Sequence, residues 1–167
     1  MPKIIKQQDN RREFIDTLIE LAEKDEKVCL IVPDVGFNYI EEFSKRFPDR
    51  FFNFGVTEQS TTLIATALAI DGWRPFVYSM INFVLFRPGE FVRNGIVAHN
   101  ANVTLLGVKG GSSYKFLGVG HNLLHDKEDF NFCDNIGLKW SHPTTTKQVR
   151  DIILSNYKNK EAIYIRL

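Results

Sequence analysis

The chain has 167 residues, of which 44% are hydrophobic and 25% charged, so it has the size and composition of one globular domain and not of a disordered or fibrous chain. Its net charge of +1 gives no sign of a nucleic-acid partner. No apolar run approaches the roughly 18 residues of a membrane span, and the N-terminus is too polar for a signal sequence. We therefore expect a soluble, cytoplasmic protein without a membrane partner.

Helical and extended patterns alternate along the chain. Helices are predicted where apolar residues recur with a period near 3.6, and strands where short β-branched or aromatic runs occur. Pro48 and Gly72 mark two helix ends. The predicted elements are a helix at 10–22, a strand at 28–32, a helix at 39–47, a strand at 50–54, a helix at 57–69, a strand at 75–79, a helix at 88–99, a strand at 102–108, a helix at 126–135, a strand at 139–142, a helix at 145–157 and a strand at 162–167.

This alternation predicts a three-layer α/β/α fold with a mostly parallel, doubly wound sheet. In such folds ligands bind beyond the carboxyl ends of the strands. The segments expected there are 34–38, 55–59, 79–87, the glycine-rich stretch 109–121 and 142–146, with Arg166 at the end of the last strand.

Two further features are the cysteines and the phenylalanines. Cys29 lies in an apolar run and is interpreted as a small buried hydrophobe, whereas Cys133 could be reactive, although no base is arranged near it. Two thiols make no disulfide framework. The chain has 14 Phe against 5 Tyr and 2 Trp. Because Phe has no polar group, these rings must fill a core, an interface or a stacking site.

Two segments at the expected sheet edge contain candidate site residues. Glu58 follows a strand and Gly55, in the first turn of a helix, where it either interacts with the helix dipole or projects a carboxylate into a site. Met80, Phe83 and Phe86 recur at a spacing of three, which fits either a helical core stripe or a slot for a flat heterocycle. Arg87, Glu90 and Arg93 could form ion pairs on the helix surface, which contribute little individually.

These residues carry a resemblance to a known family. The segment GVTEQ at 55–59, then NFVLFR at 82–87 and E-x-x-R-N at 90–94, is similar to the pyrimidine-binding domain of transketolase-like thiamine-diphosphate enzymes. The register is nearly constant from Arg11 to Arg166 and covers most of the chain. The resemblance implies a thiamine-diphosphate-binding fold, with residues 1–167 forming a single pyrimidine-binding domain.

The resemblance also implies how the cofactor is held. Glu58 corresponds to the glutamate that hydrogen-bonds N1′ of the aminopyrimidine, favouring the tautomer that removes the thiazolium C2 proton. Phe83 corresponds to the residue that stacks on the pyrimidine ring. Met80 and Phe86 correspond to other members of the aromatic wall, and Asp34 to a further cofactor contact.

Substrate contacts are implied at four positions where transketolases surround a sugar phosphate: Arg11, Asn38, Lys109 and Arg166. Three are cationic, which suits an anion, although each could equally be a solvated surface charge. His121 matches the histidine of the family pattern G-E-D-G-x-[ST]-H-Q and could contact substrate oxygens or shuttle protons. Leu117 stands where the family has an aspartate that recognises a substrate hydroxyl, so a modified or deoxy sugar is expected.

The G-D-G…N signature of the family's diphosphate-binding domain does not occur in the sequence. We therefore expect the diphosphate-binding and C-terminal domains to be absent, and no metal ligands in this chain. Mg²⁺ and the diphosphate would be bound by a partner subunit, without which the enzyme is inactive. The expected assembly is a heterodimer, or a heterotetramer of two copies with two partners, including self-association.

The leading hypothesis is thus the small subunit of a split transketolase-like transferase, which moves a two-carbon ketol unit between sugars or sugar phosphates. One alternative is a decarboxylase or synthase that resembles 1-deoxyxylulose-phosphate synthases and acts on a 2-oxo acid. The other is a catalytically degenerate regulatory or scaffold domain, which the joint presence of Glu58 and Phe83 disfavours.

Overall fold

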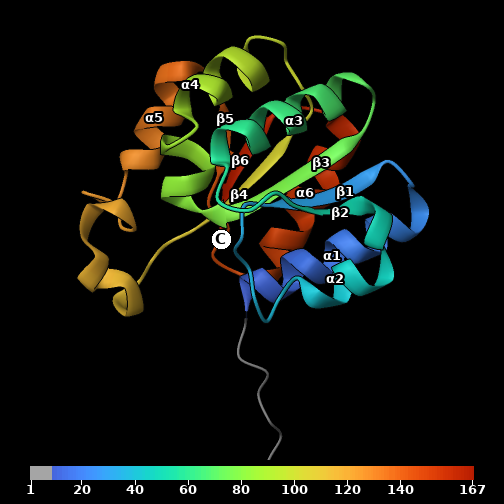
Figure 1. Cartoon of the computed structure of the whole chain (residues 1–167), viewed down its shortest axis with the longest axis horizontal. Helices are drawn as coiled ribbons and strands as arrows, with labels where there is room; N and C mark the ends of the chain where they lie inside the picture. The colour runs from blue at the N-terminus through green and yellow to red at the C-terminus, as the bar shows by residue number, and fades with distance from the viewer. Residues whose placement is uncertain (1–8) are drawn as a thin grey trace, which may run out of the picture.

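The computed structural model describes residues 9–167, which form one six-stranded parallel sheet between two layers of helices (Figure 1). The strands are β1 (Val28–Val32), β2 (Phe51–Asn53), β3 (Arg74–Met80), β4 (Thr104–Val108), β5 (Lys139–Ser141) and β6 (Ile163–Arg166). Their order is β2-β1-β3-β4-β6-β5, and every neighbouring pair is parallel. The predicted doubly wound α/β fold is therefore confirmed.

The helices divide between the two faces of the sheet. On one face lie α1 (Asn10–Lys24), α2 (Glu41–Arg46) and α6 (Thr146–Asn159), and on the other α3 (Glu58–Ile70), α4 (Gly89–Phe91) and α5 (Glu128–Ile136) (Figure 1). Four further segments are the 3₁₀ turn η1 (Pro48–Arg50), the π-helical segments η2 (Asn82–Phe86) and η3 (Val92–Val97), and the 3₁₀ segment η4 (Ser112–Gly120).

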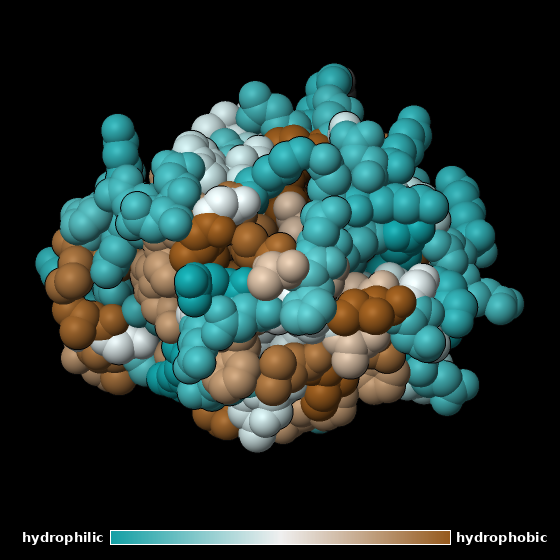
Figure 2. Space-filling model, turned by 90° about the horizontal axis from the view of Figure 1, so that it is seen from above, coloured by the Kyte–Doolittle hydropathy of each residue, from teal (hydrophilic) through white to brown (hydrophobic). Residues whose placement is uncertain are grey.

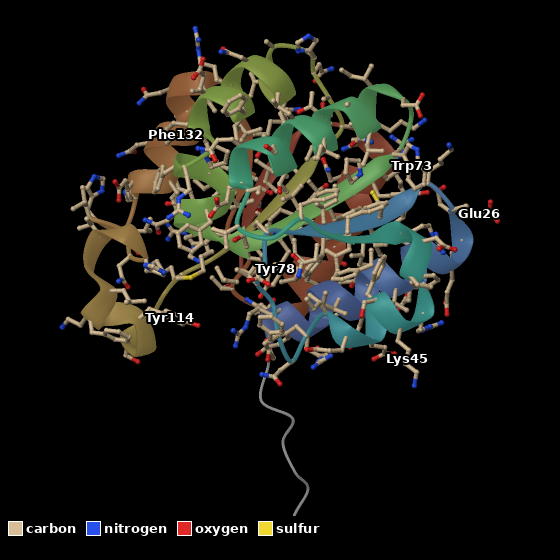
Figure 3. The ribbon with its side chains drawn as sticks, in the orientation of Figure 1. Glu26, Lys45, Trp73, Tyr78, Tyr114 and Phe132 are labelled. Carbon is tan, nitrogen blue, oxygen red and sulfur yellow. The ribbon has the colours of Figure 1, made fainter. Side chains whose placement is uncertain are left out.

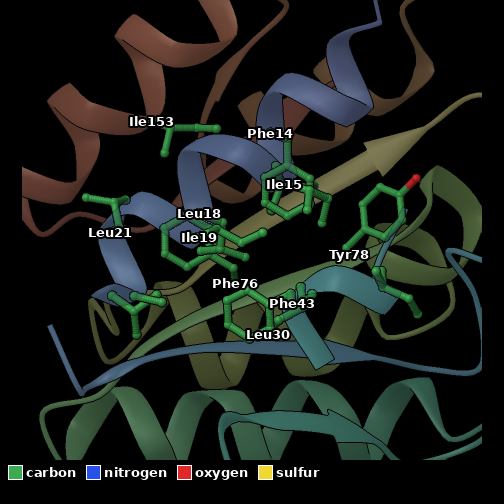
Figure 4. Packing of buried hydrophobic residues seen from close by; sticks show 14 of the residues in the cluster. Phe14, Ile15, Leu18, Ile19, Leu21, Leu30, Phe43, Phe76, Tyr78 and Ile153 are labelled. Carbon is green, nitrogen blue, oxygen red and sulfur yellow. The ribbon is translucent and has the colours of Figure 1, made fainter. Parts of the chain in front are cut away.

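Alternation along β1 creates two cores. Leu30 points into the core beneath α1, where it lies with Phe14, Phe43 and Phe76 (Figure 4). Its neighbour Ile31 points the opposite way, into the core beneath α3 and α5. Because successive strand side chains face opposite sides, the apolar run VCLIV, buried at every position, contributes side chains to both cores.

The cysteines belong to the second core and its surroundings. Cys29 and Cys133 both have no exposed surface. The expectation of a buried Cys29 is confirmed, and burial raises the pKa of its thiol to about 12. Burial likewise raises the pKa of Cys133, so neither thiol has the exposed, low-pKa environment of a reactive cysteine.

The main departure from the predicted elements lies before Pro88. The helix expected at 88–99 is preceded by η2, which begins at Asn82. Pro88 has no N–H and therefore cannot donate to a carbonyl of the preceding turn. At the residue before it, the Arg87 N–H reaches the Asn82 carbonyl, five residues back, at 2.8 Å, which is a π-helical hydrogen bond. The chain therefore turns into a helix directly after β3, which brings Phe83 to the edge of the sheet.

A second departure is the glycine-rich stretch 109–124, in which η4 forms a segment that projects from the left of the molecule in Figure 1. Within residues 9–167 no helix is both long and apolar enough to cross a membrane.

Candidate active site

A pocket of about 400 Å³ lies at the carboxyl ends of β1, β3 and β4. This is where the strand order reverses between β1 and β3, the usual ligand position in doubly wound sheets. Five predicted site residues line this pocket: Arg11, Asp34, Asn38, Met80 and Lys109. Tyr114, which was not predicted from the sequence, also lines it. Tyr78 lines the same pocket from the end of β3 (Figure 3).

The loop after β1 is held in a strained conformation. Asp34 and Asn38 have φ angles of 55° and 74°, in the left-handed region that few non-glycine residues adopt. Asn53 braces the first, because its Oδ1 accepts hydrogen bonds from the N–H groups of Asp34 and Gly55 at 3.1 and 3.0 Å. The Asn38 carbonyl accepts from Arg12 at 2.7 Å. Such strain persists only where the surroundings impose it, and it clusters at binding sites.

Arg11 forms one wall of the pocket. Its guanidinium lies 4.3 Å from the centroid of the Tyr39 ring, and the Tyr39 hydroxyl donates to Asp9 at 2.9 Å. Burial opposes ionisation of Asp9, but hydrogen bonds from Tyr39 and from the backbone of Arg11 and Arg12 outweigh it and lower its pKa. The anchored Tyr39 ring therefore holds a cation at the rim of the pocket.

Lys109, which follows β4, also lines the pocket but is paired with Asp126. The hydrogen bond from Lys109 is the main reason that the pKa of the Asp126 carboxyl lies below its usual value. Both side chains are exposed, at 47% and 73%. The pair is therefore solvated, and an incoming anion can compete with Asp126 for Lys109 at little cost.

Arg166 is placed very differently from the other predicted substrate contacts. Its side chain is only 1% exposed and pairs with Asp129, which is fully buried. Nε donates to Asp129 Oδ2 at 2.9 Å, Nη2 donates to the Asp126 carbonyl at 2.6 Å, and the guanidinium stacks 3.9 Å from the centroid of Phe130. The structure thus encloses Arg166 beside the pocket, and its contact with substrate stays a prediction.

Glu58 lies at the first position of α3 and is 4% exposed. Arg87 Nη1 donates to its Oε1 at 2.5 Å, and the Arg87 guanidinium carbon lies 4.3 Å from the centroid of the Phe83 ring. Among the described residues, no hydrogen bond to the second oxygen of Glu58 is formed. Glu58 and Phe83, predicted to act together, are therefore joined through Arg87, which sequence reasoning had assigned only to surface ion pairs.

His121 joins this group from the glycine-rich stretch. Its ring meets the edge of Phe83 at 4.9 Å between centroids and 84° between planes, and it stacks parallel to Tyr114 at 6.2 Å. Its side chain thus lies beside the ring predicted to stack on a cofactor. Leu117, from the same segment, is 39% exposed.

The two phenylalanines of the predicted aromatic wall, Phe83 and Phe86, lie in different surroundings. Phe86 packs edge-on against Phe132 of α5 at 5.7 Å, as a peripheral member of the second core, whereas Phe83 faces Arg87 and His121. In Figure 3, Phe132, which contacts Phe86, lies well apart from Tyr114, which stacks on His121. Met80 is 8% exposed and lines the pocket. A cofactor contact by Phe86 stays a prediction.

These features define a doubly wound α/β domain with a buried carboxylate and an aromatic ring beside a ligand pocket. The model of the family described as "Transketolase, pyrimidine binding domain" matches residues 6–167. The chain belongs to this family, as the sequence resemblance indicated.

Individual relatives agree with this assignment. One of the subunits of the apulose-4-phosphate transketolase of Phocaeicola vulgatus is 31% identical over 158 residues, covering 94% of this chain and 50% of that protein. A 1-deoxy-D-xylulose-5-phosphate synthase of Aquifex aeolicus is 41% identical over 93 residues, covering 54% of this chain and 14% of that protein. The chain spans about half the length of the transketolase relatives it matches.

Solved structures show the same fold. A structure described as "Split gene transketolase, inactive beta4 tetramer" matches with a TM-score of 0.82 and 27% identity over 95% of this chain and 50% of that one. The transketolase of Campylobacter jejuni matches with a TM-score of 0.81 at 15% identity, covering 96% of this chain and 26% of that chain, and shows the fold alone.

Proposed function

We propose that this chain is the pyrimidine-binding part of a split transketolase-like enzyme that transfers a two-carbon ketol unit between sugars or sugar phosphates. The observation that carries the proposal is the buried Glu58 carboxylate next to the Phe83 ring. Family membership and the 31% identity to a transketolase subunit support it.

The residues fit the aminopyrimidine end of thiamine diphosphate. Arg87 is itself a planar group with N–H donors, and it bonds Glu58 while lying over Phe83. A planar heterocycle with a protonated ring nitrogen presents the same chemistry to the same two residues. When bound, the cofactor supplies the carbon nucleophile. Arg87 must move aside to admit it.

Glu58 is suited to hold a proton on a ring nitrogen. A carboxylate shielded from water forms a stronger hydrogen bond than an exposed one, because the local dielectric constant is low. Phe83 provides a flat apolar surface that fixes the plane of a bound ring. Together they orient the group and keep water from one side of it.

We propose that Arg11, Asn38 and Lys109 bind the substrate in the adjoining pocket. Arg11 and Lys109 provide positive charge at the rim, and the strained Asn38 lines the same pocket. Their charges suit a phosphate or another anionic end. His121, beside Phe83, would contact the reacting oxygens and move protons at that end of the site.

We also propose a partner. The family description concerns the pyrimidine end, so the diphosphate and its Mg²⁺ would be held by another domain or chain. Hydrophobic surface supports such a contact (Figure 2), since four apolar side chains on or beside α3 are exposed: Val56, Leu63, Ile64 and Ile70. Phe37 and Phe116 are 64% and 83% exposed, so part of the phenylalanine excess lies at the surface.

The test is reconstitution. The chain is mixed with a diphosphate-binding transketolase subunit, thiamine diphosphate and Mg²⁺, and products are identified with a ketose phosphate or pyruvate as donor. Ketol transfer from the ketose supports the proposal. Turnover of pyruvate instead supports the synthase alternative, which the 41% identity to a synthase over 93 residues favours. Turnover that is unaffected by omitting this chain contradicts both.

A further inference from the structure

The segment that carries His121 closes on itself. Gly111 and Gly118 have φ angles of 61° with ψ near the extended value, a combination open almost only to glycine. Gly110 lies against the other end of the segment, since a Cβ there would come 2.5 Å from the His121 carbonyl oxygen. Residues 110–122 therefore form a compact loop whose ends meet beside the pocket.

One asparagine ties the loop internally. The Asn122 side-chain amide donates to the carbonyls of Tyr114 and Gly118 at 2.9 and 2.8 Å. Both N–H groups of this amide are thus used within the loop. Because both partners are carbonyl oxygens, they require the nitrogen, and not the oxygen, of the amide.

A second asparagine ties the loop to the helical segment that carries Phe83. The Asn82 amide of η2 donates to the carbonyls of Val119 and Asn122, at 2.9 and 3.4 Å. Asn82 precedes Phe83 in the chain, and Asn122 follows His121. The hydrogen bond from Asn82 to Asn122 therefore sets the distance between Phe83 and His121, whose ring centroids lie 4.9 Å apart.

We propose that Asn82 and Asn122 are positioning residues that together hold the His121 ring against Phe83. Neither residue was among the predicted site residues, although Asn82 lies in the segment 79–87 that was expected at this edge of the sheet. A catalytic consequence rests on the proposed function, because it requires that His121 acts on substrate. The clamp itself rests only on the hydrogen bonds and ring contacts above.

The sharpest test removes the two donors, at Asn82 without a change in side-chain size. Asn82→Asp keeps the shape of the side chain but cannot donate to two carbonyls, and Asn122→Ala removes the internal tie. Asn131→Ala, on the exposed surface of α5, is the matched control. In the full chain, NMR reports the ring-current shift of the His121 ring, and hydrogen exchange reports the opening of residues 112–122.

Two hydrogen bonds of ordinary strength correspond to about a tenfold or larger change in an opening equilibrium. We therefore expect exchange in the loop to rise at least about tenfold in both variants. The His121 shift should move toward that of a free histidine, while sheet amides and the control stay unchanged. An Asn82→Asp variant with an unchanged shift and unchanged exchange would overturn the proposal, whatever the reconstituted activity.

Activity measurements then separate the structural clamp from its catalytic consequence. In the reconstituted enzyme, an open loop should lower kcat more than it raises KM, because the cofactor and anion contacts remain. If the loop opens but turnover is unchanged, the clamp stands and the role of His121 in the proposed reaction is wrong.

Discussion

Two arginine–carboxylate pairs lie at the same edge of the sheet, yet they differ in burial and support. Arg166 and Asp129 are 1% and 0% exposed, and Tyr164 donates its hydroxyl to Asp129 at 2.7 Å. In the other pair Glu58 is 4% exposed but Arg87 is 41% exposed. One pair is enclosed on both sides, whereas the other opens to solvent on the arginine side.

The difference shows how one chemical pairing serves two purposes. Arg166 cannot move into solvent without leaving the buried Asp129 carboxylate uncompensated, so this pair fastens β6 to α5. Burial, with the charge of Asp129 adding to it, raises the pKa of Tyr164 well above its usual value, so the phenol stays a donor. Arg87 can swing into water and leave a preformed carboxylate for a ligand. The following predictions test this contrast.

The largest expected effect is on stability, from Asp129→Ala. Removing one partner of a buried pair leaves Arg166 uncompensated and typically lowers the free energy of unfolding by about 3–5 kcal/mol. Denaturant titration measures the change. The double variant Asp129→Leu/Arg166→Met should recover part of this loss, because no unpaired charge remains. An Asp129→Ala variant as stable as wild type would show that the Arg166–Asp129 pair does not stabilise the fold.

The next effect concerns Glu58→Gln in the reconstituted enzyme. Glutamine keeps the shape but holds no charge for a ring nitrogen, so we expect turnover to fall by about a hundredfold or more. Stability should change little, since Arg87 is free to reach solvent. Glu90→Gln, on the exposed surface of α4, serves as the control. Turnover equal to wild type would favour the scaffold interpretation.

A smaller effect is expected for Arg87→Gln. A ligand ring must displace the guanidinium from Glu58 and Phe83, which for a half-exposed pair costs about 1 kcal/mol. Removing the guanidinium should therefore tighten binding of thiamine to the free chain by about fivefold. Calorimetry or ligand-detected NMR measures this affinity, with the exposed Arg93→Gln as control. Weaker binding would instead make Arg87 a ligand contact.

The smallest effect involves a third pair, Arg150 with Glu20, which joins α6 to α1 at the surface with N–O distances of 2.8 and 2.6 Å. The hydrogen bond from Arg150 lowers the pKa of Glu20 below 4.5, so the stabilisation is present above that pH and is lost as the pH falls below it. Glu20→Gln should cost a few tenths of a kcal/mol near neutral pH. Thermal unfolding should show the difference shrink as the pH falls below 4.5, and a difference that grows in acid would contradict this sign.

Much of the fold could be predicted from local patterns. The apolar run at Val28–Val32 indicated a strand buried on both faces. Thr145 caps the N-terminus of α6, where its side chain accepts a hydrogen bond from the Gln148 N–H, so this capping interaction is set within four residues. Such features depend on neighbours in the chain. The alternation of helices with strands then left few possible topologies, because crossover connections between parallel strands are almost always right-handed.

Part of the site could be predicted in the same way. Glu58 and Phe83 each follow a strand, so the sequence alone placed both at the carboxyl edge of a parallel sheet. The fold class likewise placed Lys109 and Asn38 at this edge. The family resemblance then indicated which ring and which carboxylate belong together.

The partner that each polar group finds is visible only in the folded molecule. Arg166 and Lys109 are both cations near strand ends, but Asp129 buries the first while Asp126 leaves the second in water. Arg87 reaches Glu58 across 29 positions, and Asn82 reaches the carbonyl of Asn122 across 40. The sheet, its two apolar faces and the edge where doubly wound sheets usually bind ligands could be predicted from the sequence, because these follow from periodicity. The pairing of charges and amides depends on distances between distant segments, which no local pattern contains.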